Sequence, residues 1–331
     1  MKTTPINIFS LNVPCCNKCR YCLLSWDGTI IGTSYNRSLS FARKFYEWLK
    51  NNHSNLSFSY YFGYSMDHPN LFDVIKSLQE TNSPGGKFLQ FDGMKKRTNE
   101  ELNEFLEKLK ESGIETLNFT IYGKKEYHDR FAGRIGDFNL MINTINIAKE
   151  KNIKVEVGIP VIKENINQLT ELVDLISNKN IRVSLFTPHC GGKGIFLYDS
   201  KITIDDYESL DDHIKKLFNR NNNKTQSEWL LNPPKEVENR VLTLSLTKEN
   251  IDELESKDFE DIIKSLEEQD EKYYSIISSF NELLTKYCDK NDNKLYTKKD
   301  LYMIYRKKYI DEKNIIIKDI NDERYSGSIR Y

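Results

Sequence analysis

Residues 6–22 read INIFSLNVPCCNKCRYC, a short β-prone run followed by a crowd of cysteines. The run Ile6–Val13 is expected to form a strand. Cys15, Cys19 and Cys22 follow it at CxxxCxxC spacing, with Cys16 as an extra thiol. The three spaced cysteines therefore lie on the loop directly after the first expected strand.

The spacing of these three thiols points to a metal centre with an open position. Thiolates are the usual ligands of iron–sulfur clusters, and three of them hold three irons of a 4Fe–4S cluster and leave the fourth iron for chemistry. A structural zinc site uses four ligands, usually as two separated pairs, and the sequence has no second CxxC or HxxxH pair. The alternative is a zinc knuckle, or cysteines that bind no metal at all. Cys16 is expected to be structural, with a role as an alternative ligand in second place.

Strand-like and helix-like segments alternate over roughly the first 190 residues, which predicts a parallel β/α architecture. The six alternations fall short of the eight of a closed barrel, and an open doubly wound sheet is the alternative topology. In both, functional groups collect at the carboxyl ends of the strands, where the cysteines lie. The expected strands are 6–13, 56–63, 88–91, 115–122, 154–162 and 181–187. The expected helices are 40–52, 71–80, one that starts at a capping box over 98–101 and stops at Gly113, 137–151 and 168–177.

Length and composition limit the classes of protein. The chain has 331 residues, a net charge of -1 and 38% hydrophobic residues, which is enough for one large α/β domain and an appendage. The balanced charges give no basic field for nucleic acid or an anionic membrane. The apolar run after Met1–Pro5 is too short and too polar for a signal peptide or a membrane span. We expect a cytoplasmic protein whose cysteines are reduced.

The CxxxCxxC loop, with aromatic Tyr21 just before its last cysteine, resembles the signature of the radical S-adenosylmethionine (radical SAM) superfamily. The resemblance covers about residues 6–194. It implies a partial (β/α)6 TIM-like barrel in which Cys15, Cys19 and Cys22 hold a 4Fe–4S cluster. It also implies that S-adenosylmethionine chelates the open iron and is reductively cleaved to a 5′-deoxyadenosyl radical, which takes a hydrogen atom from a substrate.

Later segments resemble the superfamily more loosely. Tyr64 stands where a glutamate is common, and Ala132 where many relatives carry arginine. Each segment also has a purely structural alternative. The segment with Tyr64 is then an ordinary strand-to-helix turn, and the arginines beside Ala132 are solvated surface residues. Asn165 is expected to cap the next helix rather than to reach the cofactor. On the resemblance, the S-adenosylmethionine site contains Gly63, Tyr64, Thr120, Arg130, Arg134, Gly158 and Ile159.

The segment Pro188–Gly194 ends the sixth expected strand and contains Cys190. At the mouth of the site this thiol is a candidate hydrogen-atom donor to the substrate. A buried structural thiol is the more common role of such a cysteine.

The alternation of strands and helices ends at about residue 196. We therefore expect a barrel over 1–195 and a helix-rich region over 196–331. Only Cys288 lies beyond Cys190, so an auxiliary cluster is not expected there. A lid, a substrate surface or a dimer surface is favoured, and nucleic acid is unlikely despite interleaved tyrosines and lysines. The expected elements of this region are helices 203–219, 247–256, 259–287 and 297–309 and a strand at 241–246.

The leading functional hypothesis is a radical SAM enzyme that acts on a small molecule or a peptide. Its electron donor is expected to be a reductase or a flavodoxin-type protein. Radical methylation or sulfur insertion is a second possibility, but the extra cysteines or cofactor domain that they usually need are not found. A non-catalytic metal- or cluster-binding scaffold with a degenerate cofactor site is the alternative from another class.

Overall fold

The computed structural model describes residues 4–10, 15–22, 32–53, 55–62, 66–81, 86–177, 181–235 and 242–315. Every strand pairing between these residues is parallel. One sheet has the strand order β2-β1-β7 and the other β3-β4-β5-β6. The strands are β1 (Thr4–Ser10), β2 (Leu56–Phe62), β3 (Phe88–Gln90), β4 (Thr116–Thr120), β5 (Lys154–Pro160), β6 (Arg182–Phe186) and β7 (Leu242–Ser245).

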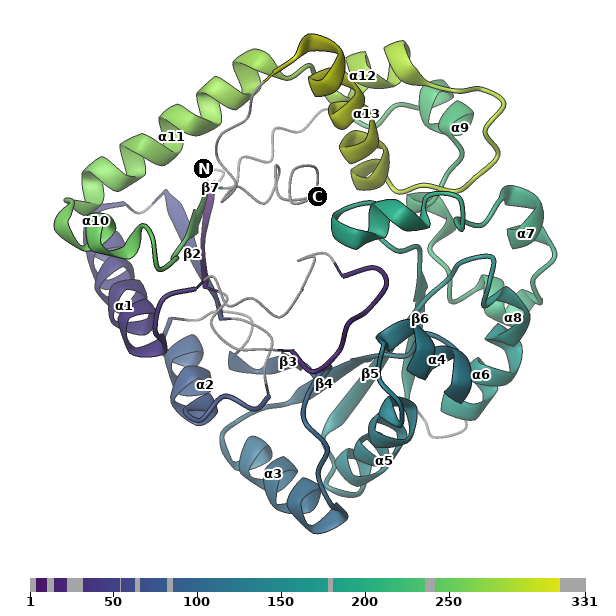
Figure 1. The fold of residues 1–331 in the computed structure, drawn as a ribbon, viewed down its shortest axis with the longest axis horizontal. Coiled ribbons are helices and arrows are strands. Elements are labelled where there is room, and N and C mark those ends of the chain that lie inside the picture. Colours follow the sequence, from purple (N-terminus) through teal and green to yellow (C-terminus); the bar gives the residue numbers. More distant parts are fainter. Residues whose placement is uncertain are drawn as a thin grey trace.

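The strand order distinguishes between the two expected topologies. A doubly wound sheet reverses its order part-way, which places helices on both faces. Here β3, β4, β5 and β6 follow one another in sequence, so right-handed crossovers put every helix on the same face and curl the sheet. Figure 1 shows the result, a ring with helices outside and strands inside. The prediction of a partial TIM-like barrel is confirmed, with β7 as an additional strand beside β1.

The helices confirm several local predictions and correct two. Thr98 and Glu101 form the expected capping box at the start of α3, and Gly113, with φ of 84°, follows the end of that helix. The expected helices over 203–219 and 259–287 are each two helices. The second divides because Ser279 and Glu282 form a capping box that starts a new helix after α11. The helices are α1 (Tyr35–Asn52), α2 (Leu71–Glu80), α3 (Asn99–Glu111), α4 (Lys125–Ala132), α5 (Asp137–Glu150), α6 (Leu169–Ser177), α7 (Ile204–Glu208), α8 (Asp212–Lys215), α9 (Gln226–Leu231), α10 (Ile251–Ser256), α11 (Phe259–Ile276), α12 (Phe280–Tyr287) and α13 (Lys298–Lys313).

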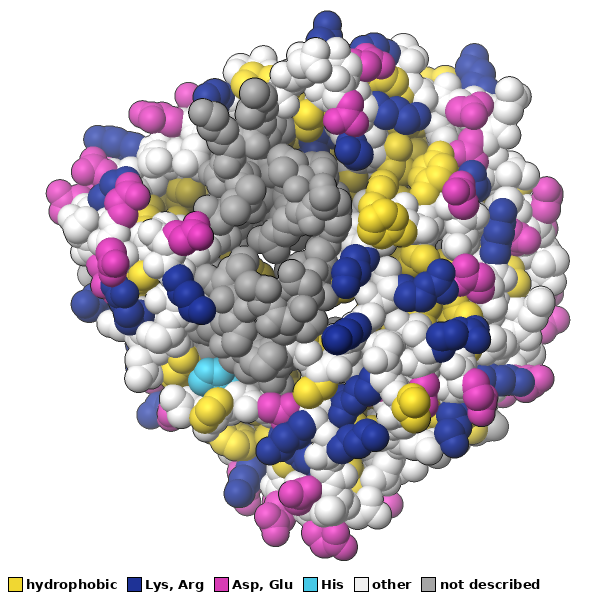
Figure 2. All heavy atoms as spheres, in the orientation of Figure 1, with side chains coloured by type: hydrophobic (Ala, Val, Ile, Leu, Met, Phe, Trp, Pro, Cys, Tyr) yellow, Lys and Arg dark blue, Asp and Glu magenta, His cyan; other side chains and the backbone are white. Residues whose placement is uncertain are grey.

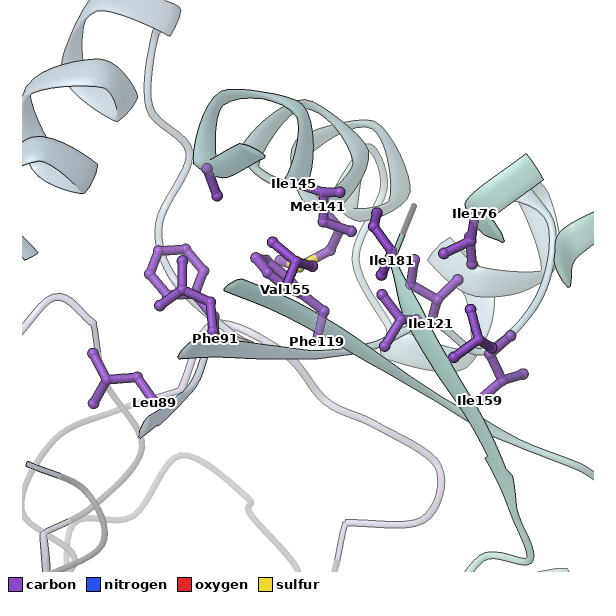
Figure 3. Close-up of a cluster of buried hydrophobic side chains, with 14 of the residues drawn as sticks. Leu89, Phe91, Phe119, Ile121, Met141, Ile145, Val155, Ile159, Ile176 and Ile181 are labelled. Atoms are coloured by element: carbon purple, nitrogen blue, oxygen red, sulfur yellow. The ribbon is translucent and has the colours of Figure 1, made fainter. Parts of the chain in front are cut away.

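The alternation of side chains along the strands separates the core from the interior of the ring. Phe119 in β4 and Ile159 in β5 are fully buried and lie on the helix side of the sheet. Phe119 lies toward Met141 and Ile145 of α5, and Ile159 toward Ile176 of α6 (Figure 3). Because successive side chains of a strand point to opposite faces, Thr120 and Gly158 face the interior of the ring. The helix side is therefore a hydrophobic core, and the inner face is available to polar groups.

The C-terminal region takes part in the ring. β7 pairs with β1 from Ile6–Leu242 to Phe9–Ser245, and α10 and α11 cover that sheet from outside. α9, α12 and α13 occupy the part of the ring between β6 and α11 (Figure 1). In the described part of the chain, no helix has the length and hydropathy that crossing a bilayer requires.

Candidate active site

The cysteine loop, residues 15–22, is anchored to two neighbouring elements by its backbone. The amide of Cys16 donates to the carbonyl of Gly93, just after β3, at 2.8 Å. The amides of Lys18 and Arg20 donate to the carbonyls of Ala132 and Phe131, at the end of α4, at 2.8 and 3.1 Å. These bonds hold the loop across the carboxyl ends of β3 and β4, on the inner side of the ring (Figure 1).

The three spaced thiols are half-buried, and Cys16 is exposed. Burial raises the pKa of the Cys15 thiol to about 12 and lifts the pKa of the Cys19 thiol well above its ordinary range. The negative charges of the other thiolates add to both shifts, which places Cys15, Cys19 and Cys22 within electrostatic range of one another. Binding of iron therefore has to release protons from these thiols.

The backbone of Gly93 packs directly against the sulfur of Cys15. Gly93 has φ of 68°, and a Cβ at this position would lie 2.1 Å from Cys15 Sγ. Only a glycine therefore fits beside this thiol. No three His, Cys, Asp or Glu side chains within the described ranges are arranged around a single metal ion. The donor set, three thiols on one loop with the sulfur of Cys15 against bare backbone, fits an iron–sulfur cluster with three protein ligands.

A buried polar network lies beneath the loop. Asp137, at the start of α5, accepts from Asn17 Nδ2 at 3.0 Å and is 3.1 Å from His128 Nε2. Arg134 Nη1 reaches the same carboxylate at 3.2 Å and Asn17 Oδ1 at 3.4 Å. Above the network, Tyr122 Oη lies 3.1 Å from Cys19 Sγ. Asn17, which lies between Cys15 and Cys19, is thus tied to the barrel through the buried carboxylate of Asp137.

A second polar group faces the interior of the ring beside the loop. The carboxylate of Asp92, just after β3, accepts from the Thr120 amide at 3.0 Å and from the Thr120 hydroxyl at 2.9 Å. Gln90 Nε2 donates to the same carboxylate at 2.5 Å. Burial raises the pKa of Asp92, and the hydrogen bonds from Thr120 and Gln90 oppose that rise. Its charge also acts on Cys15 and Cys19, so it lies close to the thiols.

The remaining residues expected at the cofactor site are in different settings. Gly63 and Tyr64 lie outside the described residues. Gly158 faces inward, where a Cβ would be 3.0 Å from the ring of Phe186, whereas the side chain of Ile159 is in the core. Arg130 is exposed on α4, and its guanidinium lies 5.4 Å from the centre of the Tyr127 ring. Arg134 is taken up by the network beneath the loop.

Cys190 is 1% exposed and packs among aromatic side chains of the C-terminal helices. Its amide donates to Asp300 Oδ1 at 2.9 Å, and Lys201 Nζ donates to Asp300 Oδ2 at 3.0 Å. Burial by itself would raise the pKa of Asp300, but the charge of Lys201, the nearby His189 ring and the hydrogen bond from the Cys190 amide hold that pKa well below its ordinary value. These contacts fasten the loop after β6 to α13. A role of Cys190 as hydrogen donor stays a prediction.

Asn165 is buried and does not reach toward the thiols. Its Nδ2 donates to the carbonyls of Tyr122 and Pro160, both at 2.7 Å, and its Oδ1 accepts from the Ile162 amide at 3.0 Å. Asn165 precedes a short 3-10 helix but makes no side-chain cap to it. The expectation of a cap was therefore wrong, because the side chain instead joins the loops after β4 and β5.

Sequence patterns did not predict roles for Asp92, Tyr122 or the network around Asp137. A signal for Asp92 is present in the sequence, since a charged residue directly follows the apolar strand 88–91 at a carboxyl end. The pairing of Tyr122 with Cys19 had no such signal, because 103 residues separate them.

Comparisons with known proteins identify the family. A family model described as Radical SAM superfamily matches residues 11–176, half of the chain. The Fe-coproporphyrin III synthase of Methanosarcina barkeri is 23% identical over 148 residues, which is 44% of this chain and 37% of that protein. The match thus spans little more than a third of this curated relative.

Two solved structures are similar to this chain, and the first of them supports the fold. The crystal structure of Streptococcus suis SuiB bound to precursor peptide SuiA has a TM-score of 0.51 at 13% identity, over 74% of this chain and 58% of SuiB. Escherichia coli HemN, a coproporphyrinogen III oxidase and radical SAM enzyme, gives 0.45 at 11% identity, over 92% and 91% of the two chains. With the matching family model and a CxxxCxxC loop at the carboxyl ends of a parallel β/α ring, this chain belongs to the radical SAM superfamily of enzymes, whose cofactors are a 4Fe–4S cluster and S-adenosylmethionine.

Proposed function

We propose that Cys15, Cys19 and Cys22 bind a 4Fe–4S cluster, at which S-adenosylmethionine is reductively cleaved for hydrogen abstraction from a substrate. The observation that carries the proposal is the position of the three thiols, on one loop held over the carboxyl ends of β3 and β4. When bound, the cluster supplies the electron that cleaves the sulfonium and so generates the 5′-deoxyadenosyl radical. The protein supplies the three thiolates and the fixed loop geometry.

We further propose that Asp92 and Thr120 bind polar groups of S-adenosylmethionine. Asp92 lies between the thiols and the inner face of the ring, and Thr120 orients it through two hydrogen bonds. An ionised carboxylate in this position suits the ammonium group of the cofactor, because charge-assisted hydrogen bonds are the strong ones. Gly158 offers bare backbone on the next strand. Arg130 stays a candidate for the carboxylate of the cofactor.

The substrate class proposed is a small molecule or a peptide that enters the ring beside the cysteine loop. Two of the three similar proteins above represent one class each, since one is named for Fe-coproporphyrin III and the other holds a precursor peptide. We propose that the helices of residues 196–331 cover the opening between β6 and β7 and form part of the substrate surface. The expected boundary at residue 195 needs one correction, because β7 pairs with β1 and so belongs to the barrel. Cys190 remains the candidate hydrogen donor, with its thiol buried beneath this surface.

The electron donor proposed is a reductase or an acidic, flavodoxin-type protein. Lys18 and Arg20 lie within the cysteine loop and are exposed, and Lys125, Arg130 and Lys163 are exposed nearby. Figure 2 shows Lys and Arg side chains gathered over this region. Opposite charge on a partner would steer it toward the cluster. A cytoplasmic location supplies such donors and keeps the thiols reduced.

One experiment tests the proposed function. The full chain is reconstituted anaerobically with iron and sulfide, reduced, and given S-adenosylmethionine, and 5′-deoxyadenosine is measured. We expect the product from wild type and none from Cys19→Ala, with Cys288→Ala as the matched control that keeps it. Zinc in place of iron, or an intact cluster that gives no 5′-deoxyadenosine under strong reduction, would contradict the proposal; the second outcome would favour a cluster-binding scaffold.

A further inference from the structure

Tyr122 is the side chain that contacts the sulfur of Cys19. Its Oη lies 3.1 Å from Cys19 Sγ, in a part-buried setting just beyond the end of β4. A thiolate that binds iron carries no hydrogen, so in the loaded protein the phenol has to be the donor of this bond. Tyr122 then donates a hydrogen bond directly to a ligand of the cluster.

The ring of Tyr122 is fixed in place. It is 3% exposed and stacks between His128, at 5.1 Å and 30°, and Phe131, at 4.6 Å and 28°. Tyr21, from the cysteine loop itself, packs edge-on at 5.6 Å and 72°. The hydroxyl cannot turn away from Cys19 without the loss of these contacts.

His128 is fixed in turn. Its Nδ1 accepts from the amide of Tyr122 at 3.2 Å, so the hydrogen of the neutral ring is on Nε2 and points to Asp137 at 3.1 Å. Asp137 also accepts from Asn17, in the cysteine loop. The phenol and the loop are therefore anchored to the same buried carboxylate, and the separation of Oη and Sγ is set by the barrel.

We propose that Tyr122 tunes the reduction potential of the cluster by its hydrogen bond to Cys19, an inference that rests on the proposed function. Hydrogen bonds to cluster sulfurs are one of the means by which proteins set these potentials. The donor stabilises the reduced cluster more than the oxidised one, because the reduced cluster carries more negative charge. Tyr122 is thus a positioning and tuning residue that makes the cluster easier to reduce.

The test compares Tyr122→Phe with Tyr127→Phe in the reconstituted full chain. Both variants remove one phenol hydroxyl from the same aromatic cluster, but that of Tyr127 donates to Glu164, at 3.0 Å, instead of to a cysteine. The potential is measured by titration with EPR detection of the reduced cluster. For Tyr122→Phe we expect the ratio of reduced to oxidised cluster at a fixed potential to fall about tenfold, a shift of about 59 mV to more negative values. Tyr127→Phe should match wild type.

A second measurement tests the hydrogen bond on the wild-type cluster itself, so it does not depend on how well a variant takes up iron. Electron–nuclear double resonance of the reduced wild-type cluster should show a strongly coupled proton whose signal is replaced by a deuterium signal after exchange into deuterium oxide. Tyr127→Phe should keep this exchangeable hydrogen, and Tyr122→Phe should lose it. Equal potentials in all three proteins, or no such hydrogen in wild type, would overturn the inference alone. Failure of wild type to form a 4Fe–4S cluster would overturn the proposed function and this inference with it.

Discussion

Replacing Gly93 by alanine should prevent the loop from holding iron. Gly93 has φ of 68°, and its added Cβ would lie 2.1 Å from Cys15 Sγ. Ordinary contact between such atoms begins at about 3.5 Å, so the sulfur has to move by roughly 1.4 Å. Metal–ligand distances tolerate only about 0.2 Å. Cys15 therefore leaves the position that a cluster requires.

The matched control is Gly136→Ala, which has the same backbone problem without the clash. Gly136 has φ of 83°, and its added Cβ would meet the end of the Lys96 side chain at ordinary contact distances, 3.6 Å from Nζ and 3.8 Å from Cε. Left-handed backbone costs an alanine about 1–2 kcal/mol in either variant. Stabilities of about 5–15 kcal/mol absorb that cost, so both proteins should fold.

The measurements are iron and sulfide content after anaerobic reconstitution, and the thermal midpoint before it. We expect both variants to melt a few degrees below wild type, by about 2–4 °C per kcal/mol or less for a chain of this length. Only Gly93→Ala should lose its iron, to a tenth of wild type or less. A folded Gly93→Ala protein with full iron content and a wild-type spectrum would refute the role assigned to this contact.

Other expected outcomes concern charges. Lys201→Met should lower the free energy of unfolding in denaturant by about 3–5 kcal/mol, because it leaves the buried charge of Asp300 without its lysine. The control Lys257→Met, which breaks an exposed ion pair with Glu253, should cost under about 1 kcal/mol. Similar losses in the two variants would contradict the importance of the buried pair. The pKa of Asp300 is lowered and that of Lys201 raised by folding, so their contribution is lost only as pH falls below about 4 or rises above about 10. Because His189 Nδ1 lies 3.6 Å from Asp300 Oδ1, the comparison is made with His189→Asn in both proteins. The stability difference between that protein and the same protein with Lys201→Met/Asp300→Asn should be flat from about pH 5 to 9, and a slope within that range would argue against the buried pair. Asp92→Asn should weaken S-adenosylmethionine binding about 10- to 100-fold in calorimetry with iron content unchanged, while exposed Glu115→Gln should not; equal affinities would exclude Asp92 from the site.

Local and periodic signals predicted the barrel well. Apolar runs between turn residues located all seven strands to within a few residues, and the capping box at Thr98 located the start of α3. The same signals failed where helical periodicity continues through a break. Residues 259–287 are amphipathic throughout, which favours one continuous helix. Ser279 instead caps a new helix, α12, which packs against α13. Tertiary contacts, which periodicity does not report, decided that point.

The site was predictable only in part. The spacing of Cys15, Cys19 and Cys22 carries its chemistry within one loop. Asp92 and Tyr122 reach that loop from the ends of β3 and β4, and their role depends on which strands lie side by side. Arg134 illustrates the reverse case, since its charge suggested a cofactor contact and the structure shows it bound to Asp137. Arg134 also donates to Asn17 Oδ1 at 3.4 Å, across 117 residues of sequence. That distant partner could not be predicted from the sequence.

The pairing of β7 with β1 sets an order of events during synthesis. Ile6 pairs with Leu242, and the intervening chain takes a ribosome about 10–50 seconds to make. Over that time β2 is the one strand of the described residues that can pair with β1, and the edge of β1 that later receives β7 is unpaired. Such long-range pairing is slow to form. The nascent protein thus has an interval in which the thiols of the loop are already present and the sheet next to them is still open.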